Sequence, residues 1–331
     1  MKQTKTLKLT LEALLAAIWM VVLVGALPVF GQPSHARIAV LTPGFTFTPV
    51  YKGLKEGMAR LGYKEEQNIT FIVEDTKGSI DNLPNRVTKL LSAKPDVLFT
   101  ITTIHTVTAK QATTTVPIVF ALVGDPVGDG LIESYASSKN NVTGVSSFNA
   151  PLSGKRLEVL LEVAPRIKRL LVFVVPKEVI TLSSLRFLED TAKKFGVQLA
   201  CRDVASKEEV EAQLQKMPKE SFDAIYYMPS VLLRSTIDLF VKKAKAERVP
   251  LVVHEDSLVE QGALISYGPE PRLTGLQAAA LVDKVLRGSK PSEIVVETPN
   301  RLFLTINLTT AKEIGLKIPR GILERADRLI E

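Results

Sequence analysis

Short runs of β-branched and aliphatic residues alternate along this chain with longer stretches whose apolar residues follow a helical spacing. Strands that alternate with helices in this way form a mostly parallel sheet that carries helices on both faces. In the first part of the chain the pattern predicts strands at 38–41, 69–73, 96–100 and 118–122, separated by helices at 50–61, 82–92 and 107–112.

The same alternation restarts at Lys155, after the stretch Asn140–Leu152, which is rich in Asn, Ser, Gly and Pro and predicts a hinge. The second part predicts helices at 155–163, 183–195, 207–215 and 235–246 and strands at 170–175, 197–201, 224–227 and 251–253. A last helix at 273–286 precedes two short strands at 294–297 and 302–307 and some short helical pieces. We therefore expect an α/β protein with two doubly wound parallel-sheet lobes of similar size joined by a hinge.

The N-terminus has the three parts of a secretory signal peptide. Lys2, Lys5 and Lys8 precede a run at 13–27 that has no charged residue, and small residues follow from Gly31. An uncleaved membrane anchor is the alternative, but the run is shorter than the ~20 residues that a spanning helix needs. We expect residues 1–31 to be a cleaved signal peptide, with cleavage after Gly31 or Ala36, and the protein to be periplasmic.

Charge and cysteine content exclude several classes of protein. The formal charge is +7, but basic and acidic residues are interleaved, with no block of five like charges, so we expect no nucleic-acid partner. The single cysteine, Cys201, excludes an internal disulfide and a cysteine-rich zinc site. No cysteine lies near residue 30, so the lipid-anchored form of an exported protein is excluded as well.

In open parallel sheets, ligands bind beyond the carboxyl ends of the strands, and this rule selects the loops that follow the predicted strands. Each polar residue in these loops has an ordinary alternative, a helix cap for Ser or Thr and a turn for an Asp before Pro. The loops that the rule selects are 42–48, 102–106 and 124–126 in the first part, and 176–184, 229–230, 254–256 and 267–268 in the second.

Catalytic and metal-binding patterns are missing from the sequence. Of three histidines, His35 lies at the end of the signal peptide, and neither His105 nor His254 has a partner at metal-ligand spacing. The run from His254 to Ser257 cannot form a triad by itself, because adjacent residues on a strand point to opposite faces. Cys201 lies in an apolar strand, which favours a place in the core. We expect no enzyme activity, no metal and no cofactor.

Several segments in order along the chain resemble one known family, from about Arg37 to the C-terminus. The similar segments are Val116–Phe120, Gly124–Val127, Gly130–Ile132, Asn141–Val145, Leu258–Leu264 and Asn307–Leu316. They look like the substrate-binding proteins of ABC transporters with the type 1 periplasmic-binding fold, a group that includes tryptophan- and tyrosine-associated binders.

The resemblance implies a two-lobed clamp of the Venus-flytrap kind, in which the chain crosses between lobes near Asn149, Tyr267 and Asn300. Lobe one would then be 37–148 plus 268–298, and lobe two 149–267 plus 299–331. By match to the ligand loops of the family, the resemblance implies a set of candidate ligand-binding residues: Gly44, Phe45, Thr46, Thr102, Thr103, His105 and Asp125 in lobe one, and Ser183, Ser184, Ser230 and Asp256 in lobe two.

This sequence also departs from the family pattern. Glu270-Pro271-Arg272 stands where members usually carry Asp-Tyr-Tyr, and the loop Pro176–Thr181 lacks an Asn that members often have. His105 and Phe45 are not typical either. An aromatic amino acid as ligand therefore does not follow from the resemblance.

The function that the resemblance implies is extracytoplasmic solute binding for an ABC importer. A small polar solute would be held between the lobes and delivered to the permease subunits by a monomer. Asp125 and Asp256 would suit an ammonium group and the helix start at Thr102–Thr103 a carboxylate, which favours an amino-acid-like solute. The alternatives are a ligand-sensing protein that signals to a membrane receptor and, more remotely, a periplasmic hydrolase, for which no matched nucleophile and base are found.

Overall fold

A computed structural model describes residues 35–44, 48–218 and 221–331. The predicted signal peptide, residues 1–31, and the candidate residues Phe45 and Thr46 lie outside this part of the chain. Within it, no helix has the length and apolar character needed to cross a membrane.

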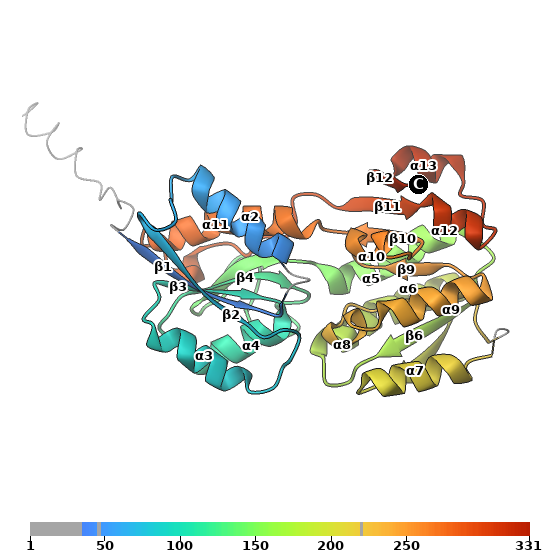
Figure 1. The fold of residues 1–331 in the computed structure, drawn as a ribbon, viewed down its shortest axis with the longest axis horizontal. Helices are drawn as coiled ribbons and strands as arrows, with labels where there is room; N and C mark the ends of the chain where they lie inside the picture. The colour runs from blue at the N-terminus through green and yellow to red at the C-terminus, as the bar shows by residue number, and fades with distance from the viewer. Residues whose placement is uncertain (1–34, 45–47, 219–220) are drawn as a thin grey trace, which may run out of the picture. The chain divides into compact units, whose positions relative to one another are not determined.

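Five parallel strands form the first sheet, in the order β2-β1-β3-β4-β5, among the residues that the structure describes. Helices alternate with these strands along the chain (Figure 1). The elements are β1 (Ala36–Thr42), α2 (Thr48–Arg60), β2 (Ile69–Asp75), α3 (Leu83–Ser92), β3 (Val97–Ile101), α4 (Thr103–Ala112), β4 (Ile118–Val123) and β5 (Val142–Ser146).

The second sheet has the order β12-β11-β10-β9-β8-β6-β7, and all of its pairs are parallel except β10 with β11. Its strands are β6 (Arg169–Val174), β7 (Gln198–Asp203), β8 (Ala224–Tyr226), β9 (Leu251–Val253), β10 (Ile265–Gly268), β11 (Phe303–Asn307) and β12 (Arg328–Ile330). The helices that follow β5 in the chain are α5 (Asn149–Val163), α6 (Val179–Phe195), α7 (Lys207–Lys216), α8 (Val231–Arg234), α9 (Ile237–Glu247), α10 (Asp256–Glu260), α11 (Pro271–Leu286), α12 (Leu308–Glu313) and α13 (Arg320–Arg325), of which α11 packs on the first sheet.

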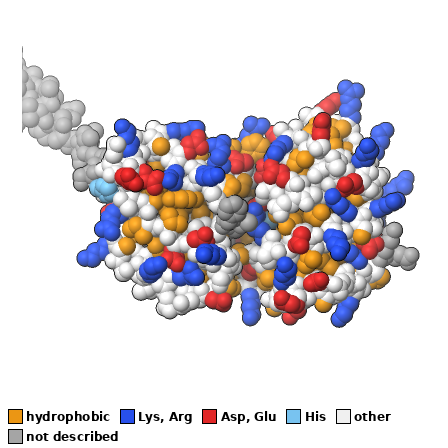
Figure 2. All heavy atoms as spheres, in the orientation of Figure 1, with side chains coloured by type: hydrophobic (Ala, Val, Ile, Leu, Met, Phe, Trp, Pro, Cys, Tyr) orange, Lys and Arg blue, Asp and Glu red, His pale blue; other side chains and the backbone are white. Residues whose placement is uncertain are grey.

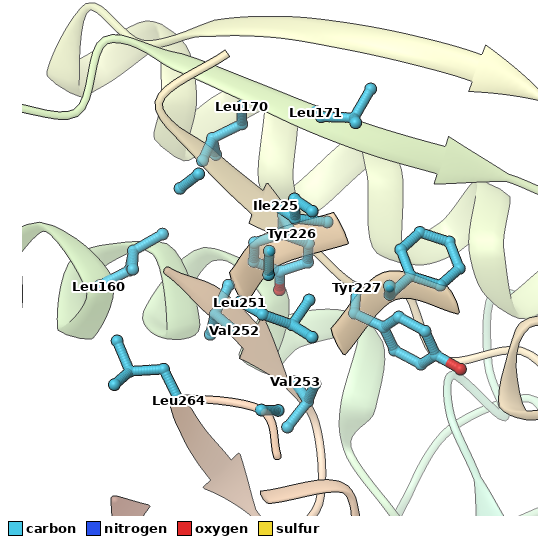
Figure 3. Packing of buried hydrophobic residues seen from close by; sticks show 14 of the residues in the cluster. Leu160, Leu170, Leu171, Ile225, Tyr226, Tyr227, Leu251, Val252, Val253 and Leu264 are labelled. Atoms are coloured by element: carbon cyan, nitrogen blue, oxygen red, sulfur yellow. The ribbon is translucent and has the colours of Figure 1, made fainter. Parts of the chain in front are cut away.

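Alternate residues of the central strands bury against different helices, as the twofold period of a strand requires. In β1, Ile38 and Val40 pack in one cluster with α2 and α11, whereas Ala39 and Leu41 pack in another with α3 and α4. In the second sheet, the buried residues of β6, β8 and β9 lie side by side (Figure 3). The prediction of two α/β lobes with parallel sheets is confirmed, and we call the parts built on these sheets the first and the second lobe.

Helix α11 packs closely against α2, although the two helices are far apart in the sequence. Their backbones approach each other at two glycines. A Cβ atom at Gly53 would lie 1.9 Å from the carbonyl oxygen of Arg272, and one at Gly275 would lie 1.9 Å from that of Val50. Only glycine permits such contact. The helix that follows β10 in sequence is thereby fixed to the first lobe.

The structure differs from the predicted elements at several places, and strands β10 and β12 were not predicted at all. The stretch predicted as a hinge, Asn140–Leu152, contains strand β5 and the start of α5. The stretch predicted as a strand at 294–297 follows a 3-10 turn, η3 (Pro291–Glu293), and pairs only at Glu297, with Val145. Val295 is 57% exposed, so the apolar run is only half buried and its alternation misled the prediction.

Arg156 of α5 is wholly buried and joins two connections of the chain. Its Nε donates a hydrogen bond of 2.7 Å to the carbonyl oxygen of Tyr267, and its Nη1 one of 3.0 Å to that of Asn149. Its Nη2 donates to the side chain of Asn149 as well. The start of α5 and the end of β10 are therefore tied to one guanidinium.

On the face in Figure 2, blue and red side chains are mixed, with hydrophobic patches between them.

Candidate functional site

A cavity of about 120 Å³ lies where the strands of both sheets reach their carboxyl ends. Parallel strands bring the loops that follow them to one edge of a sheet, so this is the expected place for a ligand. The wall is formed by Thr102, Thr103, Ile104, Val107, Leu122, Ser147, Asn149, Lys177, Glu178, Val179, Ile180, Pro229, Ser230, Val231, Arg234, His254, Glu255, Pro269 and Pro271.

The wall of the first lobe is built on strained backbone. Thr102 follows β3, Leu122 is the last residue but one of β4, and Phe148 lies after β5 between the wall residues Ser147 and Asn149. Their φ values are 76°, 59° and 55°. A side chain at such a φ costs about 1–3 kcal/mol, and residues of this kind concentrate at functional sites. Thr102 directly precedes α4, so the free backbone N–H groups at the start of that helix lie beside the cavity.

His105 supports this helix start from behind. Its Nδ1 lies 2.9 Å from Thr102 Oγ1 and its Nε2 lies 3.2 Å from Thr76 Oγ1. Burial lowers the pKa of His105 to about 4, so the ring is neutral at physiological pH. The structure therefore gives His105 a supporting contact to Thr102 and does not place it in the wall.

Glu178 organises the wall of the second lobe. Its carboxylate accepts hydrogen bonds from the backbone N–H groups of Val231 and Leu232, at 2.8 and 2.9 Å, and from Ser230 Oγ at 3.0 Å. Ser230 is also the N-cap of α8 and accepts a hydrogen bond from the N–H of Leu233. One carboxylate thus fixes the loop after β8 and the start of α8.

A buried ion pair joins Arg234 and Glu255, whose side chains are 10% and 8% exposed. Burial alone would raise the pKa of Glu255, but the Arg234 charge and a hydrogen bond from Ser257 hold it below its usual value. With Lys177 and Glu178, the charged residues of the wall are two basic and two acidic. The wall is therefore neutral overall, although both signs of charge are present.

Part of the wall is apolar, and one contact there joins the lobes. Ile104, Val107 and Leu122 face the cavity from the first lobe, and Val179 and Ile180 from α6. A Cβ atom at Gly124, just after β4, would lie 1.8 Å from Ile180 Cδ1. The absence of a side chain at Gly124 thus lets Ile180 seat against the first lobe.

Of the residues expected from sequence, Thr102, Thr103 and Ser230 line this cavity. Gly44, Ser183, Ser184 and Asp256 lie outside the wall, as does Asp125. Asp125 Oδ1 accepts a hydrogen bond of 2.9 Å from the N–H of Gly128, which is the turn-forming role left open as its alternative.

The other expected residues also have local partners or deep burial. Asp256 accepts a hydrogen bond of 2.9 Å from the N–H of Ser257, and its Oδ2 lies 3.5 Å from Arg328. Ser183 and Ser184 are fully buried in α6. Within the described ranges, no group of three His, Cys, Asp or Glu side chains is placed to hold a metal ion.

Sequence reasoning missed the charged part of the wall. Glu178, Arg234 and Glu255 were not selected as ligand residues, although His254 and Glu255 belong to a loop that the strand rule identified. Nothing in the sequence indicated that Arg234 belongs to the site, because only the fold brings the end of α8 beside the loop after β9.

Comparisons with known proteins point to one family. The profile of a family described as ABC transporter substrate binding protein matches residues 37–330. A tyrosine-binding protein of Clostridioides difficile is 26% identical over 266 residues, which are 80% of this chain and 76% of that protein.

Solved structures share the fold over nearly their whole length. A conserved domain protein from Vibrio cholerae has a TM-score of 0.84 and 29% identity, covering 89% of this chain and 99% of its own. An ABC domain in complex with L-Trp from Streptococcus pneumonia also has a TM-score of 0.84, with 24% identity, covering 90% and 100%.

The Arg234–Glu255 pair yields a test of the site's stability. We expect Glu255→Gln to lower the free energy of unfolding by about 3 kcal/mol or more, because it removes one charge of a buried ion pair. Since the pKa of Glu255 is held below its usual 4.5, the cost should be complete above about pH 4.5 and shrink as the pH falls further. Urea denaturation at several pH values measures it.

The matched control is Glu324→Gln, which removes an exposed pair with Arg320 and should leave unfolding unchanged. Equal effects of the two variants at neutral pH would contradict the account of the buried pair.

Proposed function

The chain belongs to the ABC transporter substrate-binding protein family, and we propose that it is the extracytoplasmic solute-binding component of an ABC importer. The family consists of substrate-binding proteins, which confirms the expectation that the chain is not an enzyme. We further propose that the protein is exported through the signal peptide at residues 1–31, that it acts as a monomer, and that it delivers its solute to membrane permease subunits.

The observation that carries this proposal is a cavity walled by both sheets. We place the lobe boundaries at 37–148 plus 268–298 and at 149–267 plus 299–331. Each lobe alone offers only part of the contacts, so a solute favours the arrangement in which both lobes reach it. Ile180 against Gly124 is a contact made in that arrangement.

An amino-acid-like solute fits the chemistry of the wall. Two basic and two acidic side chains leave the wall neutral, which suits a zwitterion better than a net anion or cation. The start of α4 suits a carboxylate, because unpaired N–H groups and the helix dipole both favour negative charge there. The apolar side chains beside it would receive an apolar side chain. The tyrosine-binding relative and the structure with L-Trp support this class.

A thermal-shift screen of the purified protein tests solute binding. We expect L-amino acids with apolar side chains to raise the melting temperature, whereas sugars and purines should not. A solute at ~1,000 times its Kd adds about 4 kcal/mol of stability, which is a shift of several degrees. If protein shown by mass spectrometry to be free of carried-over solute responds only to sugars or purines, or to no amino acid, the proposal is wrong.

The lobe contact is tested by Gly124→Val. The added side chain collides with Ile180 when the lobes approach, so we expect affinity for the stabilising amino acid to fall about tenfold or more. Calorimetry should show that Ile180→Ala in the same chain restores most of the loss. Equal affinity of wild type and Gly124→Val would contradict a role for this contact in closure.

Delivery to a permease is tested in cells. Deleting the gene from the source organism should abolish uptake of the same labelled amino acid at low external concentration. A plasmid carrying the wild-type gene should restore uptake, and the Gly124→Val gene should do so poorly. Unchanged uptake in the deletion strain would favour a sensing role instead.

A further inference from the structure

Two buried polar atoms of the second lobe, one in the cavity wall and one behind it, have no hydrogen-bond partner among the described residues. They are His254 Nδ1 and Tyr227 Oη. The two residues are 7% and 1% exposed. Buried polar groups are nearly always hydrogen-bonded, because a group that loses water without gaining a partner destabilises the fold. Each of these two atoms therefore calls for an explanation.

The fold places the two residues at equivalent positions. Tyr227 follows β8 and His254 follows β9, and these strands are parallel neighbours. The rings stack with 8° between their planes and 6.1 Å between their centroids. His254 lines the cavity, whereas Tyr227 packs edge-on against Phe240 of α9. The imidazole is thus held flat by the tyrosine ring, and of the two residues His254 is the one that a bound solute meets.

The surroundings of His254 determine which nitrogen carries its proton. Its Nε2 lies 3.9 Å from a carboxylate oxygen of Glu255. That carboxylate is ionised through Arg234 and Ser257, and an ionised carboxylate only accepts hydrogen bonds. At 3.9 Å the two groups form no hydrogen bond, but the negative charge nearer to Nε2 favours the proton on that nitrogen, which leaves the lone pair on Nδ1.

The ring is also neutral. Burial lowers the pKa of His254 to about 3, and Arg156 and Arg234 add to the effect while Glu255 opposes it. Nδ1 is therefore a hydrogen-bond acceptor over the physiological pH range, and its missing partner must be a hydrogen-bond donor.

We propose that His254 Nδ1 accepts a hydrogen bond from the ammonium group of the bound solute, so that the site selects amino acids over the corresponding acids without an amino group. The inference rests on the proposed solute binding in this cavity. It replaces Asp125 and Asp256 as partners of the ammonium group, since both have local partners outside the wall. Glu255, next in the chain and also in the wall, favours positive charge at the same place.

Calorimetry with two matched pairs of solutes tests the inference in the purified protein. The pairs are L-phenylalanine with phenylpropanoate and L-leucine with isocaproate, which differ only in the amino group. We expect wild type to prefer the amino acid of at least one pair by about tenfold or more. The preference should be constant from about pH 5 to pH 8, because His254 stays neutral there.

The variants separate recognition from structure. His254→Phe keeps a flat ring on Tyr227 but removes the acceptor, so it should weaken amino-acid binding about tenfold and leave the matched acid nearly unchanged. His254→Asn restores an acceptor oxygen and should recover part of the preference. Tyr227→Phe, which removes the other unpartnered atom behind the wall, is the control and should keep the preference.

Each other result is informative. Three results would overturn the inference: equal loss for both members of a pair in His254→Phe, no loss at all in that variant, or wild-type affinity that falls as the pH rises through about 6.5. In each case wild-type binding of amino acids would still support the proposed function. Absence of wild-type binding to both amino acids would overturn the inference, and the thermal-shift screen then decides whether the proposed function survives for another solute.

Discussion

The arrangement of this protein depends on one buried guanidinium. Arg156 is fully buried and has carbonyl and amide oxygens as acceptors instead of a carboxylate. A charge in this position is tolerated only while its hydrogen bonds are made, so the backbone at Asn149 and Tyr267 is held firmly. Asn149 and Pro269 line the cavity, which means that the same interaction that fixes the connections between the lobes also fixes part of the wall.

The cavity that this interaction helps to shape has two unlike halves. The first lobe contributes strained backbone and the start of α4, which are fixed dipoles that need no charged side chain. The second lobe contributes charged side chains that have fixed partners: Glu178 is held by the start of α8, and Arg234 by Glu255. The proposed amino-acid solute is a zwitterion with one end for each half, so a wall without net charge would still distinguish the two ends.

The sequence predicted the fold well and the site only in part. The period of apolar residues located nearly every central strand and helix, because burial on both faces leaves a strong pattern. The strand-end rule found Thr102, Thr103 and Ser230, but it could not tell which carboxylate in a loop faces inward. Asp125 accepts a hydrogen bond within its own turn. Glu178 accepts hydrogen bonds from the start of α8, which only the tertiary structure brings near it. The short edge strand β12 was missed because its residues are mostly exposed.

The most direct test of this account is a crystal structure of the protein grown with the amino acid that stabilises it most. The account predicts electron density between the start of α4 and the loop after β9, with the carboxylate at Thr103 and the ammonium group within hydrogen-bond distance of His254 Nδ1. Density for the amino acid elsewhere, for example in the surface groove that includes Glu158 and Phe195, would contradict it, as would a reversed orientation with the carboxylate at His254.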